Sequence, residues 1–72
     1  MIFNERIKIL REEHDLTQDK AAREMDMPLR SYARLEADGA KAHYDTLLKI
    51  ADYYDVSLDW LMGRTDKREV NR

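Results

Sequence analysis

The sequence contains no cysteine, which excludes disulfide bonds and thiolate metal sites and is typical of a reducing compartment. Long hydrophobic runs are also missing. No apolar run is longer than three residues, and the polar Asn4 follows the run MIF at residues 1–3 at once. We therefore expect neither a signal peptide nor a membrane span, and a cytoplasmic protein that does not associate with membranes.

Proline and glycine are scarce, with one proline and two glycines in 72 residues. No stretch alternates apolar and polar residues over the length that a half-buried strand needs, and neither a repeat nor a low-complexity segment is present. These absences predict one compact all-α domain with short turns between its helices. A domain of this length is close to the lower limit for folding on a hydrophobic core alone.

Positive charge is not in excess, because 13 Lys and Arg residues face 15 Asp and Glu residues and leave a net charge of −2. No global positive field therefore indicates a nucleic-acid partner. The distribution is nevertheless uneven: residues 50–62 carry three aspartates and no base, whereas residues 27–35 carry Arg30 and Arg34 and no acid. We expect one acidic surface and one locally basic surface.

Apolar spacing and capping residues predict five helices, at about residues 4–13, 18–25, 28–36, 44–54 and 58–62. Asn4, Thr17 and Ser57 are the expected N-caps, and Pro28 suits a first helical position because it lacks an N–H. Asp38-Gly39 and Gly63 are expected to end the third and fifth helices. The expected core consists of Phe3, Ile7, Leu10, Leu16, Met25, Met27, Tyr32, Leu35, Leu47, Ile50, Ala51, Tyr54, Val56, Leu58 and Leu61.

The third expected helix has two different faces. Arg30, Ser31 and Arg34 lie on one face, and Tyr32 and Leu35 lie on the other. Two helices of about this length, joined by a turn of three or four residues, form a unit in which the first braces against the phosphate backbone and the second enters the major groove of DNA. The outward face of the third helix is therefore a candidate for contact with base edges.

Residues 6–63 resemble the XRE-type helix-turn-helix family of phage repressors and Cro proteins. The matching blocks are RIKILRE at 6–12, LTQ at 16–18, Ala22, RLE at 34–36, LLKIA at 47–51 and VSLDWLMG at 56–63. Because several spaced blocks agree in order, the match is specific. The resemblance implies a DNA-binding transcriptional regulator, which we expect to be a repressor, with the helix-turn-helix domain at residues 1–63 and a charged, frayed tail at 64–72.

The resemblance also assigns roles to individual residues. Arg11 and Glu36 match an ion pair that joins the first helix to the third. The base-reading positions that face the groove are filled by Leu29, Arg30, Ala33 and Arg34, and we expect Ser31 beside them to bind a base or a phosphate. Gln18 matches the family's phosphate-binding glutamine at the start of the second helix, and we expect the Thr17 hydroxyl to contribute beside it. We also expect Lys41, His43 and Tyr44 to form a second phosphate clamp at the start of the fourth helix, although His43 is explained equally well as a surface histidine.

The chain departs from the family pattern at several places. Asp26 stands where the turn usually has glycine, Pro28 replaces a Ser or Thr cap, Ala21 replaces a larger core residue, and Ala42 replaces a proline. The glycine of Asp38-Gly39 also comes one position late. Asp tolerates the left-handed conformation better than most residues, so we expect the fold to survive, while the set of DNA contacts is open.

Catalysis finds little support, because no Ser, His and acid constellation follows from the positions of the two histidines. We expect no enzyme activity, no cofactor, no metal site and no small-molecule ligand. The expected partner is double-stranded DNA with a near-palindromic operator, bound by a homodimer that pairs through Tyr53, Val56, Leu58 and Trp60. The rival interpretation is an antitoxin or protein-binding adaptor that uses the same fold.

Overall fold

The computed structural model describes residues 2–37 and 42–70, and within them it contains helices and no strand, as the sequence predicts. The helices are α1 (Ile2–Glu13), α2 (Gln18–Glu24), α3 (Leu29–Ala37), α4 (Tyr44–Tyr54) and α5 (Leu58–Leu61). The sequence therefore predicts the number of helices and most of their ends to within one or two residues.

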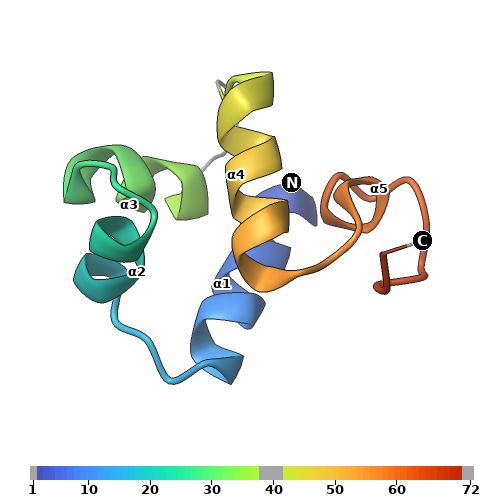
Figure 1. Ribbon diagram of the computed structural model, residues 1–72, viewed down its shortest axis with the longest axis horizontal. Coiled ribbons are helices and arrows are strands. Elements are labelled where there is room, and N and C mark those ends of the chain that lie inside the picture. Colours follow the sequence, from blue (N-terminus) through green and yellow to red (C-terminus); the bar gives the residue numbers. More distant parts are fainter. Residues whose placement is uncertain (1, 38–41, 71–72) are drawn as a thin grey trace.

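The helices are arranged around α1, which packs against α3 and against α5. The short helix α2 packs on α3, and α4 packs on α5. Figure 1 shows α2 and α3 together on one side of the domain, and α5 with the C-terminal segment on the other. The pair formed by α2 and α3 thus lies at the periphery of the domain, and α3 packs against α1.

The core draws residues from every helix. Its buried members are Phe3, Ile7, Leu10, Ala21, Ala22, Met25, Tyr32, Leu35, Ile50, Ala51, Tyr54, Val56, Trp60 and Leu61. Four residues expected in it, Leu16, Met27, Leu47 and Leu58, are only partly buried at its border. Ala21, at the position where the family has a larger residue, is fully buried.

Four of the described helix ends have the same backbone geometry. The residues after α1, α2, α4 and α5 adopt the left-handed conformation, with φ of 55°, 54°, 55° and 81° at Asp15, Asp26, Asp55 and Gly63. After α2, the Asp26 N–H donates to Arg23 O at 3.1 Å, and the Met27 N–H donates to Ala22 O at 2.9 Å. This pair of bonds satisfies the last carbonyls of a helix and turns the chain sharply.

An apolar residue follows each left-handed aspartate: Leu16, Met27 and Val56, all of which pack on the core. The aspartate reverses the chain, and the apolar residue after it ties the reversal to the domain. The expectation that Asp26 takes the place of glycine in the turn between α2 and α3 is confirmed by its φ of 54°. This turn, residues 25–28, joins α2 to α3 and therefore fixes the direction of α3 relative to α2.

Asn4 does not cap α1, because α1 begins at Ile2 and Asn4 lies inside its first turn. The Asn4 amide nitrogen instead donates to Glu36 O at 3.1 Å and to Ala37 O at 3.4 Å. Asn4 thus binds the open carbonyls at the end of α3, a long-range role that local spacing does not indicate. The expected stop at Asp38-Gly39 lies outside the described residues.

The other expected caps are present. The Thr17 hydroxyl accepts from Lys20 N at 3.1 Å, and the Ser57 hydroxyl accepts from Trp60 N at 3.2 Å. Pro28 comes immediately before α3 rather than inside it, and its carbonyl accepts from Tyr32 N at 3.1 Å. All three residues therefore mark helix starts, as the sequence predicts.

Residues 64–70, expected to be a frayed tail, lie against the domain and contact α1 and α5. The Ser57 N–H donates to Arg68 O at 2.9 Å, and Arg68 forms an ion pair with Glu13. The guanidinium carbons of Arg6 and Arg68 lie over the Trp60 ring, 4.6 and 5.1 Å from its centroid. These cation–π contacts and ion pairs attract the C-terminal segment to the domain, although its charged composition predicts a solvated tail.

Candidate nucleic-acid interface

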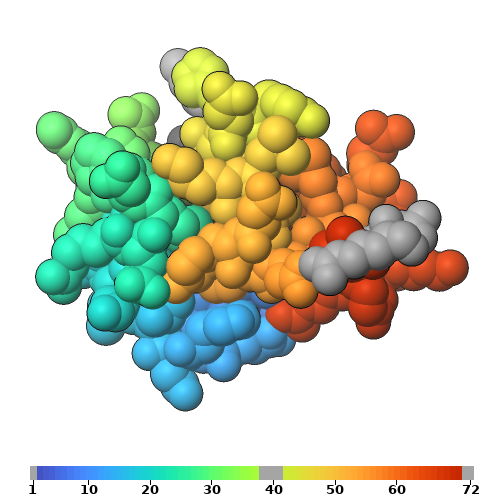
Figure 2. Space-filling model, in the orientation of Figure 1, coloured from blue at the N-terminus to red at the C-terminus, as the bar shows by residue number. Residues whose placement is uncertain are grey.

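The outward face of α3 is free of the domain's own packing. Leu29, Arg30, Ser31 and Arg34 are exposed and Ala33 is half-buried, whereas Tyr32 and Leu35, on the opposite face, are 0% and 9% exposed. In the space-filling view, α2 and α3 form one margin of the molecule (Figure 2). The five residues expected to read bases therefore lie on a surface that a ligand can reach.

The cations of α3 differ from those of α2 in their partners. On α2, Arg23 Nη2 lies 2.7 Å from Asp19 Oδ2, and Lys20 Nζ lies 4.0 Å from Glu24 Oε2. Within the described ranges, Arg30 and Arg34 have neither an ion pair nor a hydrogen bond from their side chains. The uncompensated positive charge in this region is therefore concentrated on α3.

Arg11 and Glu36 form the expected ion pair. The Arg11 guanidinium donates from Nε to Glu36 Oε2 at 2.7 Å and from Nη2 to Oε1 at 3.2 Å. Its third nitrogen donates to Leu16 O at 2.8 Å, just before the start of α2. One side chain thus connects α1, the entry to α2 and the end of α3, which fixes the angle at which α3 is presented.

The pair is shielded from water, with side-chain exposures of 14% for Arg11 and 5% for Glu36. Burial by itself raises the pKa of the Glu36 carboxyl, but Arg11, the Tyr32 hydroxyl and Gln18 together outweigh it and lower the pKa below its usual value. Glu36 is therefore ionised at neutral pH.

Gln18 and Thr17 lie at the start of α2, as expected for phosphate-binding residues. The Gln18 amide nitrogen donates to Glu36 Oε1 at 3.1 Å, a contact that sequence reasoning missed. Gln18 and Glu36 are 18 positions apart, so no local spacing indicates it. The Thr17 hydroxyl oxygen is occupied as the N-cap acceptor, and its own proton is available to a further acceptor.

The second group of expected phosphate-binding residues lies at the start of α4. His43 has the backbone conformation of an N-cap but its side chain makes no capping hydrogen bond, and Tyr44 is 64% exposed. The N-terminal N–H groups of α4 therefore lack the side-chain acceptor that a serine there provides. Lys41 lies outside the described residues.

Two of the four residues expected at a dimer interface are part of the core. Val56 is 7% and Trp60 is 8% exposed, because both belong to the core that the helices enclose. Leu58 is partly buried, and the Tyr53 hydroxyl donates to Glu24 Oε1 at 3.0 Å and links α4 to α2. The interface therefore stays a prediction, with Tyr53 the most exposed of its four residues.

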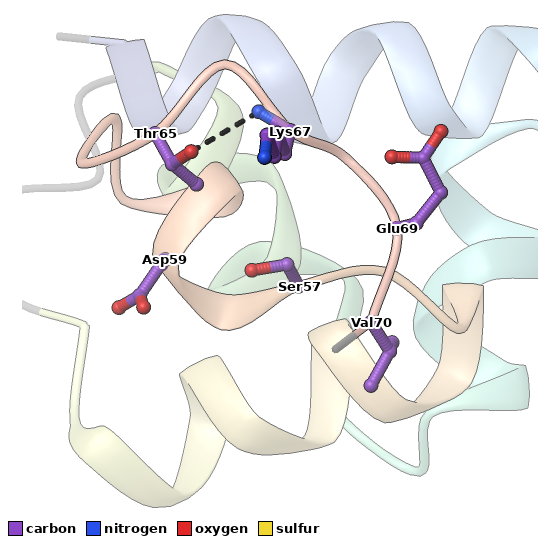
Figure 3. Close-up of a pocket in the computed structure, with 6 residues that line it drawn as sticks. All are labelled: Ser57, Asp59, Thr65, Lys67, Glu69 and Val70. Atoms are coloured by element: carbon purple, nitrogen blue, oxygen red, sulfur yellow. Dashed lines mark hydrogen bonds between the residues drawn. The ribbon is translucent and has the colours of Figure 1, made fainter. Parts of the chain in front are cut away.

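A hollow of about 390 Å³ lies between α5 and the C-terminal segment, lined by Ser57, Asp59, Thr65, Lys67, Glu69 and Val70 (Figure 3). Figure 1 places these elements on the opposite side of the domain from α3. The described residues contain no group of three or more His, Asp or Glu side chains that could hold a metal ion. None of the described helices is long and apolar enough to cross a membrane.

Comparison with known proteins agrees with this geometry. Residues 7–61 match the model of the helix-turn-helix family. The chain is 35% identical over 65 residues to the uncharacterized HTH-type transcriptional regulator YobD of Bacillus subtilis, and covers 58% of that protein. It is 31% identical over 71 residues to the HTH-type transcriptional regulator ImmR of the same organism, and covers 56% of it.

These alignments take in 90% and 99% of the present chain, which therefore spans little more than half the length of the relatives. No solved structure matches the chain significantly. The family match extends from the middle of α1 to the end of α5 and includes α2, α3 and the turn between them. The chain belongs to the XRE-type helix-turn-helix family of transcriptional regulators.

Proposed function

We propose that the chain binds double-stranded DNA in a sequence-specific manner, by inserting α3 into the major groove, and that it acts as a transcriptional repressor. The observation that carries the proposal is the pair of guanidinium groups of Arg30 and Arg34, exposed and without partners among the described residues, on a helix whose other face is anchored in the core. The relatives named as transcriptional regulators support it.

The exposed side chains of α3 suit the chemistry of base edges. Arg30 and Arg34 each carry a planar fork of donors that fits O6 and N7 of guanine. Leu29 offers an apolar surface for a thymine methyl group, and Ser31 offers a hydroxyl to a base or a phosphate. Ala33 is small enough to let the helix approach closely.

Phosphate contacts fix the register of α3 in the groove. We assign them to Thr17 and Gln18 at the start of α2 and to His43 and Tyr44 at the start of α4. Lys41, which lies outside the described residues, is assigned to phosphate binding from the family resemblance alone. Because the net charge of the chain is −2, attraction to DNA must come from this local arrangement and not from the charge of the whole domain.

A homodimer on a near-palindromic operator completes the proposal. One short recognition helix contacts few base pairs, whereas two copies related by a two-fold axis bind half-sites about 34–36 Å apart. Of the four residues expected at the interface, Tyr53 is 36% exposed and Leu58 is partly buried, whereas Val56 and Trp60 are largely buried within the single chain. Sedimentation of the protein on the selected duplex tests this, and one copy per duplex at saturation contradicts it.

The experiment that tests the function is selection of bound duplexes from a random pool at defined salt, followed by affinity measurements on the winning sequence and a scrambled one. Sequence-specific binding predicts one enriched motif and a Kd about 10³-fold or more below that of the scrambled duplex. Equal affinities for the two duplexes contradict the proposal.

The second candidate is a protein-binding adaptor, such as an antitoxin. It is favoured by the acidic residues Asp52 and Asp59, which are exposed near the α4–α5 region. The salt dependence distinguishes the two functions. DNA binding predicts a slope of log K against log salt of about −0.9 for each phosphate neutralised, whereas an adaptor shows a flat response to duplex DNA.

A further inference from the structure

Glu36 holds the amide of Gln18 in one orientation. The amide nitrogen donates to Glu36 Oε1 at 3.1 Å, so the contact joins the first residue of α2 to the last turn of α3. Because an ionised carboxylate can only accept hydrogen bonds, the nitrogen of the amide must face α3 and its oxygen must face away. The same nitrogen carries a second N–H, which no contact among the described residues uses.

Glu36 is itself fixed by Arg11, whose guanidinium binds both carboxylate oxygens, at 2.7 and 3.2 Å. The Glu36 side chain is only 5% exposed, so packing leaves it one geometry. Arg11 also compensates the charge of the carboxylate. A phosphate that approaches Gln18 therefore does not meet an unpaired anion behind it.

We propose that Glu36 is a positioning residue for phosphate binding: it orients the Gln18 amide so that the second N–H donates to a phosphate of the DNA backbone. This inference rests on the proposed function and adds a role for Glu36 beyond its ion pair with Arg11. Glu36 does not contact DNA. The alternative is that Glu36 serves only to join α1 to α3, in which case Gln18 binds phosphate equally well without it.

The first test uses the wild-type chain without DNA. Gln18 is the only glutamine in the sequence, so its side-chain amide gives one identifiable pair of NMR signals. Nitrogen relaxation should give an order parameter near that of rigid backbone, about 0.85. A value below about 0.6, as in a freely rotating side chain, overturns the proposal. This result does not depend on whether any variant folds.

The second test is a double-mutant cycle on affinity for the duplex selected from the random pool. Gln18→Ala should weaken binding about tenfold in the wild-type background, the loss typical of a hydrogen bond to a charged group. In the Glu36→Gln background the same substitution should weaken binding about twofold or less, because the amide is no longer oriented. Equal losses in both backgrounds overturn the proposal.

Arg34→Ala provides the matched control, because Arg34 lies on the same helix as Glu36 but makes no contact with it. Its loss of affinity should be the same in both backgrounds. If it shrinks together with that of Gln18→Ala, Glu36→Gln has displaced the whole of α3, and the specific role of Glu36 is contradicted. If no duplex binds the wild-type chain specifically, the proposed function fails, while the relaxation measurement still reports whether Gln18 is held.

Discussion

The Arg11 guanidinium binds both carboxylate oxygens of Glu36, with Nε 2.7 Å from Oε2 and Nη2 3.2 Å from Oε1. Two parallel hydrogen bonds fix the direction of the contact as well as its length. Arg11 comes from the last turn of α1 and Glu36 from the last turn of α3, so the pair holds the exposed helix α3 at a fixed angle to α1.

Glu36→Gln should lower the free energy of unfolding at pH 7 by about 1–3 kcal/mol, because Arg11 is left partly buried beside a neutral group. The pKa of Glu36 is lowered in the folded chain, so its contribution is present above the unfolded-state pKa of about 4.3 and is lost as the pH falls through the folded pKa. Urea unfolding between pH 7 and pH 3 should show the two proteins converging at the acidic end. A constant difference across this range contradicts the assignment.

Asp26→Gly should stabilise the chain by about 0.5–1 kcal/mol, because glycine adopts the left-handed conformation without steric cost. Asp26→Ala is the control. It keeps the Cβ and removes the polar side chain that makes this conformation tolerable, so it should be less stable than the wild type. Thermal unfolding measures the order, which should be Gly above Asp above Ala, and an alanine variant as stable as the glycine variant contradicts the account.

Arg68→Ala should release residues 64–70 from the domain, because it removes both the ion pair with Glu13 and the contact over Trp60. Trp60 is the only tryptophan, so its fluorescence should shift to longer wavelength as the ring gains contact with water. The stability should fall by about 1 kcal/mol. Lys67→Ala, at an exposed neighbouring position, should leave both quantities unchanged. Identical spectra for Arg68→Ala and wild type would show that the segment does not depend on Arg68.

The sequence predicts the fold well where the signal is local. Apolar spacing identifies the five helices of the described residues. Thr17 and Ser57 are recognisable as N-caps from their residue type, and in the structure each accepts from a backbone N–H three residues later. The inward position of Tyr32 and the outward position of Arg30 also follow from helical periodicity. The ion pair of Arg11 and Glu36 was predicted from the resemblance to the family.

The predictions that fail depend on contacts between distant parts of the chain. Asn4 is of a residue type that favours the N-cap position, but its side chain binds the carbonyls of Glu36 and Ala37, 32 and 33 positions away. The contact of Arg6 with the Trp60 ring also joins distant residues, and neither it nor the position of Arg68 over the same ring follows from local spacing. One local pattern also marks helix ends, because an aspartate followed by an apolar residue comes after α1, α2 and α4.

The central claim is that the exposed guanidinium groups of α3 read DNA, and the most direct measurement is the affinity of Arg34→Ala for the selected duplex and for its single-base variants. Arg34→Ala should weaken binding by about 1–3 kcal/mol and lose discrimination at one base pair, while Arg64→Ala, the same change at an exposed residue shortly after α5, should alter neither. Unchanged affinity and unchanged base preference for Arg34→Ala would contradict the account.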